Sequence, residues 1–342
     1  MHRRLTALAA AVLGAVALLT AACGGDDDEA APATTGAEPT LRVGLITDLG
    51  QLNDNGFNEL AYKGLKRAES ELGVAGRVVE SRSASDYVPN MTALARQGYD
   101  LIVGVGFAQG DAVATTAKLF PDTKFAIVDV DQAFLKGKPA NVVGLLFKEE
   151  QVGYLAGTLA ALEAKRNGKG VISAVGGFKE PPVDRFIAGY RAGAQAAVPG
   201  MKVRFAYSQD WVDQAKCKEL ALDQIAAGSG VVFQVAGECG LGALSAAKDR
   251  DVWGIGVDAD QSFLGPHVLT SALKGVDTAV FLTIQSLLDG GFAGGGNEVF
   301  GLDQDGVGLG KISPKAAKAD IAKVDHVEQE IAAGEVKIPT SV

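Results

Sequence analysis

Residues 43–68 read VGLITDLGQLNDNGFNELAYKGLKRA and join a strand-like run to a helix-like run through a polar turn. Leu45 and Ile46 belong to a short apolar run, which is typical of a strand buried on both faces of a parallel sheet. Asp48 marks the carboxyl end of this strand, and apolar residues recur at helical spacing from Phe57 onward. Ligands of open parallel sheets bind outside the carboxyl ends of the strands. This turn is therefore the first candidate for a binding site.

The same alternation of strand-like and helix-like runs continues along the chain and predicts doubly wound parallel sheets. Two parts of the chain echo each other. VGVGF (103–107) followed by FAIVDVD (125–131) corresponds to VFQVAGECG (232–240) followed by WGIGVDAD (253–260). The distance between the copies is far longer than a solenoid repeat. We therefore predict an α/β fold with two similar lobes joined by hinge crossovers, and one large sheet is the alternative.

The expected lobes follow the two sets of strand-like runs. Residues 41–148 are predicted to form the first lobe and residues 149–263 the second. The tail, residues 264–342, contains further strand-like and helix-like runs. Because the chain of a two-lobed binding protein crosses between its lobes more than once, we expect part of this tail to return to the first lobe.

Composition limits the kind of partner. The chain has 342 residues and a hydrophobic content of 47%, which is ample for two packed cores. Its formal net charge is −9, and removal of Arg3 and Arg4 with a leader would make it −11. Such an acidic protein is a poor ligand for nucleic acid or for an anionic membrane surface. A neutral or weakly polar small molecule fits better, and no cofactor is indicated.

The first 22 residues are predicted to be an export signal. Two arginines precede an apolar run that is short for a membrane span, and small residues lead into Cys23. The string LTAAC, residues 19–23, resembles the lipobox of bacterial lipoproteins, in which the cysteine carries the lipid. Residues 24–40 contain four consecutive acids and no large apolar side chain, so we expect a flexible linker. The predicted location is the extracytoplasmic face of the cell membrane.

Two further cysteines, Cys217 and Cys239, lie near one edge of the predicted second sheet. In an oxidising compartment they are candidates for a disulfide, with two free thiols as the alternative. A metal site is not expected, since His267 and His326 are the only histidines after the leader.

Polar and aromatic residues gather at the predicted carboxyl ends of the strands in both lobes. A nucleoside requires flat rings for stacking, and Phe57 with Trp211 would supply one from each lobe. Its ribose requires a charge-assisted acceptor and donor, for which Asp258 and Lys274 are the candidates. The base edge requires a group such as Asp48, Asn58 or Asp129. The full set of candidate ligand-binding residues is Asp48, Asn53, Phe57, Asn58, Phe107, Asp129, Trp211, Gly237, Asp258 and Lys274.

Catalytic motifs are missing from the sequence, and no catalytic residue is predicted. There is no GxSxG elbow, HExxH pair or GxxxxGK[ST] loop. The segment GVGFAQG, residues 104–110, imitates a dinucleotide-binding loop, but its third glycine comes one residue late. A nucleoside hydrolase is the enzymatic alternative, yet Asn53-Asp54-Asn55 is too slight for the calcium cluster that it would need.

Several blocks resemble the basic membrane protein family, bacterial lipoproteins that capture purine nucleosides for ABC importers. They are residues 43–68, 102–129, 141–161, 231–249, 255–261 and 271–280. The resemblance implies a type I periplasmic-binding fold, no enzymatic activity, and an ABC permease as partner of a monomeric protein. It also implies that Phe57 and Trp211 stack the base, that Asp258 and Lys274 hold the ribose, and that Asp48 and Asn58 face the base.

Two positions depart from the family pattern. Trp211 stands where a phenylalanine is usual, and GECG, residues 237–240, stands where two adjacent glycines and a threonine are common. The alternatives are a binding protein for a sugar or autoinducer on the same fold, and, ranked lower, a sensory surface lipoprotein.

Overall fold

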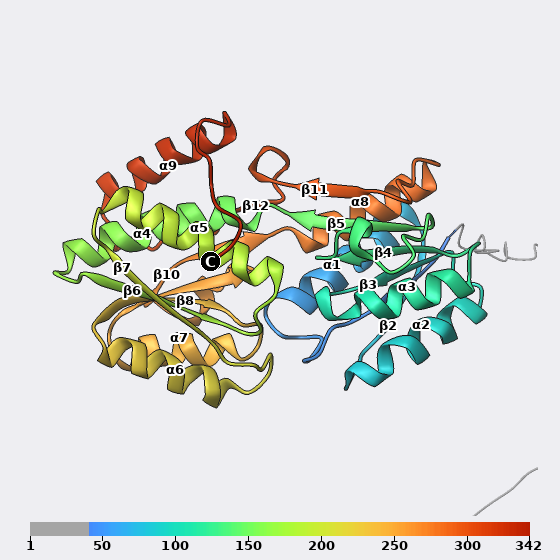
Figure 1. Cartoon of the computed structure of the whole chain (residues 1–342), viewed down its shortest axis with the longest axis horizontal. Helices are drawn as coiled ribbons and strands as arrows, with labels where there is room; N and C mark the ends of the chain where they lie inside the picture. The colour runs from blue at the N-terminus through green and yellow to red at the C-terminus, as the bar shows by residue number, and fades with distance from the viewer. Residues whose placement is uncertain (1–40) are drawn as a thin grey trace, which may run out of the picture. The chain divides into compact units, whose positions relative to one another are not determined.

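The computed structural model describes residues 41–342, and the predicted leader, Cys23 and the acidic linker lie outside these described residues. Within them the chain forms two α/β lobes, each built on a six-stranded sheet (Figure 1). The strand order is β11-β5-β4-β3-β1-β2 in the first sheet and β12-β10-β9-β8-β6-β7 in the second. All neighbouring pairs are parallel except β10 with β12. The predicted two-lobed α/β architecture is confirmed.

The first sheet contains the strands of the amino-terminal part of the chain. They are β1 (Arg42–Ile46), β2 (Ala75–Val79), β3 (Leu101–Gly104), β4 (Lys124–Val128) and β5 (Val142–Phe147). The helices between them are α1 (Phe57–Leu72), α2 (Tyr87–Arg96) and α3 (Gly110–Leu119). Strands β1, β3 and β4 are almost wholly buried, because helices cover the sheet on both faces.

The second sheet repeats this arrangement. Its parallel strands are β6 (Val171–Gly176), β7 (Lys202–Tyr207), β8 (Ser229–Val235), β9 (Trp253–Asp258) and β10 (Val268–Lys274). The helices are α4 (Glu149–Arg166), α5 (Pro181–Ala197), α6 (Gln214–Ala226) and α7 (Gly240–Asp249). Helices α4 and α5 approach so closely that a Cβ at Gly157 or Gly193 would overlap a backbone carbonyl of the facing helix. Glycine at these two positions permits the close approach.

The tail from residue 264 onward is divided between the lobes, as Figure 1 shows by its orange and red segments. Helix α8 (Val276–Leu288) packs against α1, and β11 (Asn297–Phe300) joins the first sheet beside β5. Strands β10 and β12 (Val307–Leu309) belong to the second sheet, and α9 (Lys318–Ala332) packs against α4. The chain therefore crosses between the lobes after β5, after β10 and between β11 and β12.

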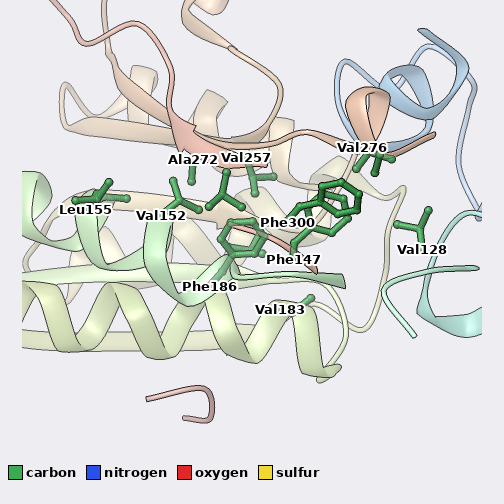
Figure 2. Close-up of a cluster of buried hydrophobic side chains, with 14 of the residues drawn as sticks. Val128, Phe147, Val152, Leu155, Val183, Phe186, Val257, Ala272, Val276 and Phe300 are labelled. Atoms are coloured by element: carbon green, nitrogen blue, oxygen red, sulfur yellow. The ribbon is translucent and has the colours of Figure 1, made fainter. Parts of the chain in front are cut away.

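One hydrophobic core continues from lobe to lobe through these crossovers. Phe147 at the end of β5 stacks on Phe300 at the end of β11, with ring centroids 5.4 Å apart. Figure 2 shows this pair near Phe186, Val257 and Val276, which come from three other elements. These side chains form the apolar floor that holds the ends of the strands, and the polar groups described below, at fixed positions.

Candidate functional site

A cavity lies between the carboxyl ends of the strands of the two sheets, and its empty space, including the part open to solvent, is about 640 Å³. We call it the cleft. Both lobes line it. The first contributes Asp48, Leu49, Gly50, Asp54, Phe57, Asn58, Gly106, Phe107 and Asp129, and the second contributes Glu180, Pro182, Val183, Phe186, Trp211, Val235, Gly237, Glu238, Val257, Asp258 and Lys274.

Nine of the ten predicted ligand-binding residues line the cleft, and Asn53 does not. Asn53 is exposed in the turn before α1. Its neighbour Asp54 takes the inward position, where its carboxylate accepts hydrogen bonds from the backbone N–H groups of Gly56, Asn58 and Glu59. These bonds satisfy donors at the start of α1. The turn therefore buries Asp54 and leaves Asn53 in solvent.

Asp48 lies just beyond β1 with its carboxylate held in place from two sides. Its Oδ1 accepts hydrogen bonds from the Tyr87 hydroxyl at 2.6 Å and from the Leu49 N–H at 2.7 Å. Asn58 Oδ1 accepts the Asp48 N–H at 2.9 Å, which turns the amide nitrogen of Asn58 the other way. Burial raises the pKa of Asp48 to about 6, although the two hydrogen bonds oppose the change.

Asp129 and Asp258 occupy equivalent positions in the two lobes. Asp129 directly follows the central strand β4, and Asp258 is the last residue of the central strand β9. Both have a left-handed backbone, with φ of 72° at Asp129 and 63° at Asp258. A left-handed aspartate at a strand end is uncommon and strained. It turns both carboxylates toward the cleft, where they are 7% and 9% exposed.

Lys274, at the end of β10, is the buried cation of the site. Its Nζ lies 2.6 Å from Asp129 Oδ1 and 3.0 Å from Glu149 Oε1, and 5.2 Å from the centre of the Phe57 ring. Sequence reasoning paired Lys274 with Asp258, but within residues 41–342 its ion pairs are with Asp129 and Glu149. An ammonium has three donors, so one remains for another partner.

Burial and charge set the protonation of this cluster. Burial alone would lower the pKa of Lys274, but the surrounding carboxylates outweigh it and the pKa is raised, so the amine stays charged. Burial raises the pKa of Asp258 to about 7 against the attraction of Lys274, and it raises the pKa of Glu149 to about 7 in the same way. Burial also raises the pKa of Glu180 to about 7, with a further contribution from Asp48 and Asp129.

Trp211 reaches the cleft from the loop after β7. Its ring lies flat against Gly177, where a Cβ would overlap it, and its centroid is 5.4 Å from that of Phe178. The Cys239 N–H donates to the carbonyl of Trp211 at 2.9 Å, and Cys239 forms a disulfide with Cys217 of α6. This network holds the tryptophan loop against the start of α7.

Sequence reasoning missed Glu149, Glu180, Tyr87 and Phe186 at the site. Glu180 precedes Pro181, and a proline in the first turn of a helix marks the residue before it as a strand-to-helix turn. This proline signal in the sequence could have identified Glu180 as a site residue. Tyr87 and Phe186 lie within helices, and only packing brings Phe186 to the cleft and the Tyr87 hydroxyl to Asp48.

The cleft thus combines four aromatic rings, several carboxylates and one cation. Carboxylates accept hydrogen bonds and do not donate when ionised, so the site is suited to a flat ligand with many donors. Among residues 41–342, no three His, Cys, Asp or Glu side chains are arranged to hold a metal ion. None of the helices in the same range combines the length and apolar character needed to cross a bilayer.

Comparison with known proteins gives matches over the whole described chain. The family described as ABC transporter substrate-binding protein PnrA-like matches residues 41–341. The CD4+ T-cell-stimulating antigen of Listeria monocytogenes is 34% identical over 363 residues, which covers 99% of each chain. The ABC transporter nucleoside-binding protein BmpA of Lactococcus lactis subsp. cremoris is 34% identical over 362 residues, covering 99% of this chain and 100% of that protein.

A solved structure agrees with the fold. The crystal structure of an ABC transporter solute-binding protein from Aeropyrum pernix K1 aligns with a TM-score of 0.78 and 28% identity. The alignment covers 88% of this chain and 93% of that one.

Proposed function

The chain belongs to the PnrA-like family of ABC transporter substrate-binding proteins, which are not enzymes, and we propose that its own ligand is a purine nucleoside. The predicted resemblance to this family is confirmed. The nucleoside-binding protein of Lactococcus lactis, at 34% identity, supports the choice of ligand.

The observation that carries the proposal is the placement of one aromatic ring from each lobe on the same cavity. Phe57 begins α1 in the first lobe, and Trp211 lies on the loop after β7 in the second. A purine has two faces, and stacking contributes roughly 1 to 3 kcal/mol per base. In our proposal the base lies between these rings.

The ribose and the base edge have separate partners in this scheme. Asp258 accepts hydrogen bonds from the vicinal hydroxyls, and the third N–H of the Lys274 ammonium donates to one of the hydroxyl oxygens. Asp48 and Asn58 face the base. Because Asp129 already pairs with Lys274, its role is to hold that amine in position rather than to bind the ribose alone.

Binding of this ligand would stabilise the closed arrangement of the lobes. A ligand shifts such an equilibrium only by its differential affinity for the two states, so it must contact both lobes. Contacts between the lobes already exist without it: the Gln261 side chain donates to the Asn55 carbonyl at 3.2 Å, and Lys274 joins Asp129. The closed, loaded protein is the form that would be recognised by the importer.

We further propose that the protein is attached by a lipid at Cys23 to the extracytoplasmic face of the cell membrane and delivers its ligand, as a monomer, to the permease. Homologues named as lipoproteins and basic membrane proteins support this. Mass spectrometry of the membrane-extracted protein tests it, since an unmodified Cys23 would contradict the anchor.

The test of the ligand is isothermal titration after unfolding and refolding to remove any bound molecule. The titrants are adenosine, guanosine, inosine, uridine, ribose and free bases. We expect tight binding of a purine nucleoside and little response to ribose or free bases. Silence across the nucleosides would refute the proposal and favour a sugar or autoinducer on the same fold.

The ribose assignment has its own test. Asp258→Ala should weaken nucleoside binding by about 1 to 3 kcal/mol, the loss expected for a charged hydrogen bond, while the weaker binding of free base is unchanged. An equal loss for base and nucleoside would show that Asp258 does not hold the ribose.

A further inference from the structure

Glu238 lines the cleft with a carboxylate oxygen that no residue satisfies. It lies in the turn between β8 and α7. Its Oε1 accepts a long hydrogen bond, 3.4 Å, from the Gln51 side chain of the first lobe. Its Oε2 is buried, and within residues 41–342 it has no hydrogen-bond partner. A buried acceptor left in this state carries a desolvation cost, so the position calls for a donor from the ligand.

The groups around this oxygen indicate which donor. Oε2 of Glu238 is 4.0 Å from the position that a Cβ on Gly50 would take, and Nδ2 of Asn58 is 3.7 Å from the same point. Asn58 Oδ1 accepts the Asp48 N–H, so the amide presents its nitrogen to the cleft; within residues 41–342 this nitrogen donates one long hydrogen bond, of 3.5 Å, to the Gln51 carbonyl. Oδ1 of Asp48 is occupied by Tyr87 and Leu49, which leaves its Oδ2 as an acceptor.

Asn58 Nδ2 and Glu238 Oε2 therefore place one donor and one acceptor near the same point of the cleft, and Asp48 Oδ2, beside Gly106, adds a second acceptor to its lining. The Watson–Crick edge of guanine offers the complement: the O6 carbonyl accepts, and N1–H and the exocyclic 2-amino group donate. Hypoxanthine, the base of inosine, has the first two groups but lacks the amino group. A site whose buried acceptor depends on one ligand donor rejects an analogue that lacks it.

We propose that Glu238 Oε2 accepts a hydrogen bond from the exocyclic amino group of the purine, so that Glu238 makes the cleft prefer guanosine to inosine. The inference rests on the proposed function and specifies the ligand of the same site.

The experiment titrates guanosine and inosine into the full-length chain, stripped of bound ligand by unfolding and refolding, and into two variants. The wild-type protein should bind guanosine about 10 to 100 times more tightly than inosine, as expected for one charge-assisted hydrogen bond. In Glu238→Ala most of this ratio should disappear through loss of guanosine affinity, with inosine changed by less than about threefold.

Gln51→Ala is the matched control, because it removes the hydrogen bond between Glu238 and the first lobe and leaves Glu238 Oε2 in place. The guanosine-to-inosine ratio of this variant should equal that of the wild type. Equal binding of the two nucleosides by the wild-type protein would overturn the inference without any variant. An equal loss of both nucleosides in Glu238→Ala would also overturn it, since Glu238 would then act only as a link between the lobes. Absence of all nucleoside binding would instead refute the proposed function itself, and this inference with it.

Discussion

Replacing Asp258 by Asn is expected to stabilise the ligand-free protein at pH 8 and to leave its stability nearly unchanged at pH 4. The reason is the environment of the carboxylate. Asp258 is buried at the end of β9, held in a left-handed conformation and surrounded by Asp54, Asp129 and Glu149. Burial raises its pKa from 3.8 to about 7, and the attraction of Lys274 only partly opposes the change.

The sign follows from the direction of this change. An acid whose pKa is higher in the folded protein binds its proton more tightly there, so its contribution to stability is complete below pH 4 and is lost as the pH rises to about 7. The difference between 3.8 and about 7, at about 1.4 kcal/mol per pKa unit, amounts to about 4 kcal/mol above pH 7. Asparagine has nearly the same shape and never ionises, so the variant avoids this loss.

Differential scanning calorimetry at pH 4 and pH 8 measures the effect. For a chain of this size about 1 kcal/mol corresponds to about 2 °C in Tm, so Asp258→Asn should melt up to about 8 °C higher than the wild type at pH 8 and within about 1 °C of it at pH 4. Asp289→Asn makes the same charge change at an exposed helix end and should shift Tm by less than about 1 °C at both pH values. A destabilised Asp258→Asn protein at pH 8, or the same difference at both pH values, would refute this account of the buried carboxylate.

Three further predictions follow from other parts of the site. Trp211→Leu should weaken binding of a purine nucleoside by roughly 1 to 3 kcal/mol in a titration, and an unchanged affinity would remove Trp211 from the binding surface. Lys274→Met should lower the free energy of unfolding by about 3 to 5 kcal/mol at pH 8, because two buried carboxylates lose their cation. The loss should be smaller at pH 5, because burial raises the pKa of Glu149 to about 7 and this carboxyl group is then protonated; a loss that does not vary with pH would contradict this explanation. Replacing both Cys217 and Cys239 by Ala should lower the free energy of unfolding by about 3 kcal/mol, the value for a loop of this length. Dithiothreitol should lower the Tm of the wild-type protein to that of the variant and should leave the Tm of the variant unchanged.

Much of the architecture was predictable because it depends on local patterns. Apolar runs set the strands, and the helix predicted from Phe57 has the bounds Phe57–Leu72 in the structure. The carboxyl end of a parallel strand is a position that the sequence marks directly, and Asp48, Asp129 and Asp258 at such positions all line the cleft. The repetition of strand and helix units in two sets was enough to predict two lobes.

Details of the turns were less predictable because side-chain direction there depends on single hydrogen bonds. Asn53 and Asp54 are neighbours, but only Asp54 reaches the free N–H groups at the start of α1, so it is buried and Asn53 is exposed. Composition and spacing do not distinguish the two.

The sequence alone determined the two-lobed α/β fold, the family, and the kinds of residue that face the cleft. The reason is that the local spacing of apolar residues marks where strands end and helices begin. Only the tertiary structure decided how the charges are paired. Lys274 ends β10 and could meet any carboxylate brought to the hinge, and the crossover after β5 places Glu149 beside it while Asp129 arrives from the other lobe. Partners so distant in the chain are chosen by how the two sheets pack together, which no local pattern records.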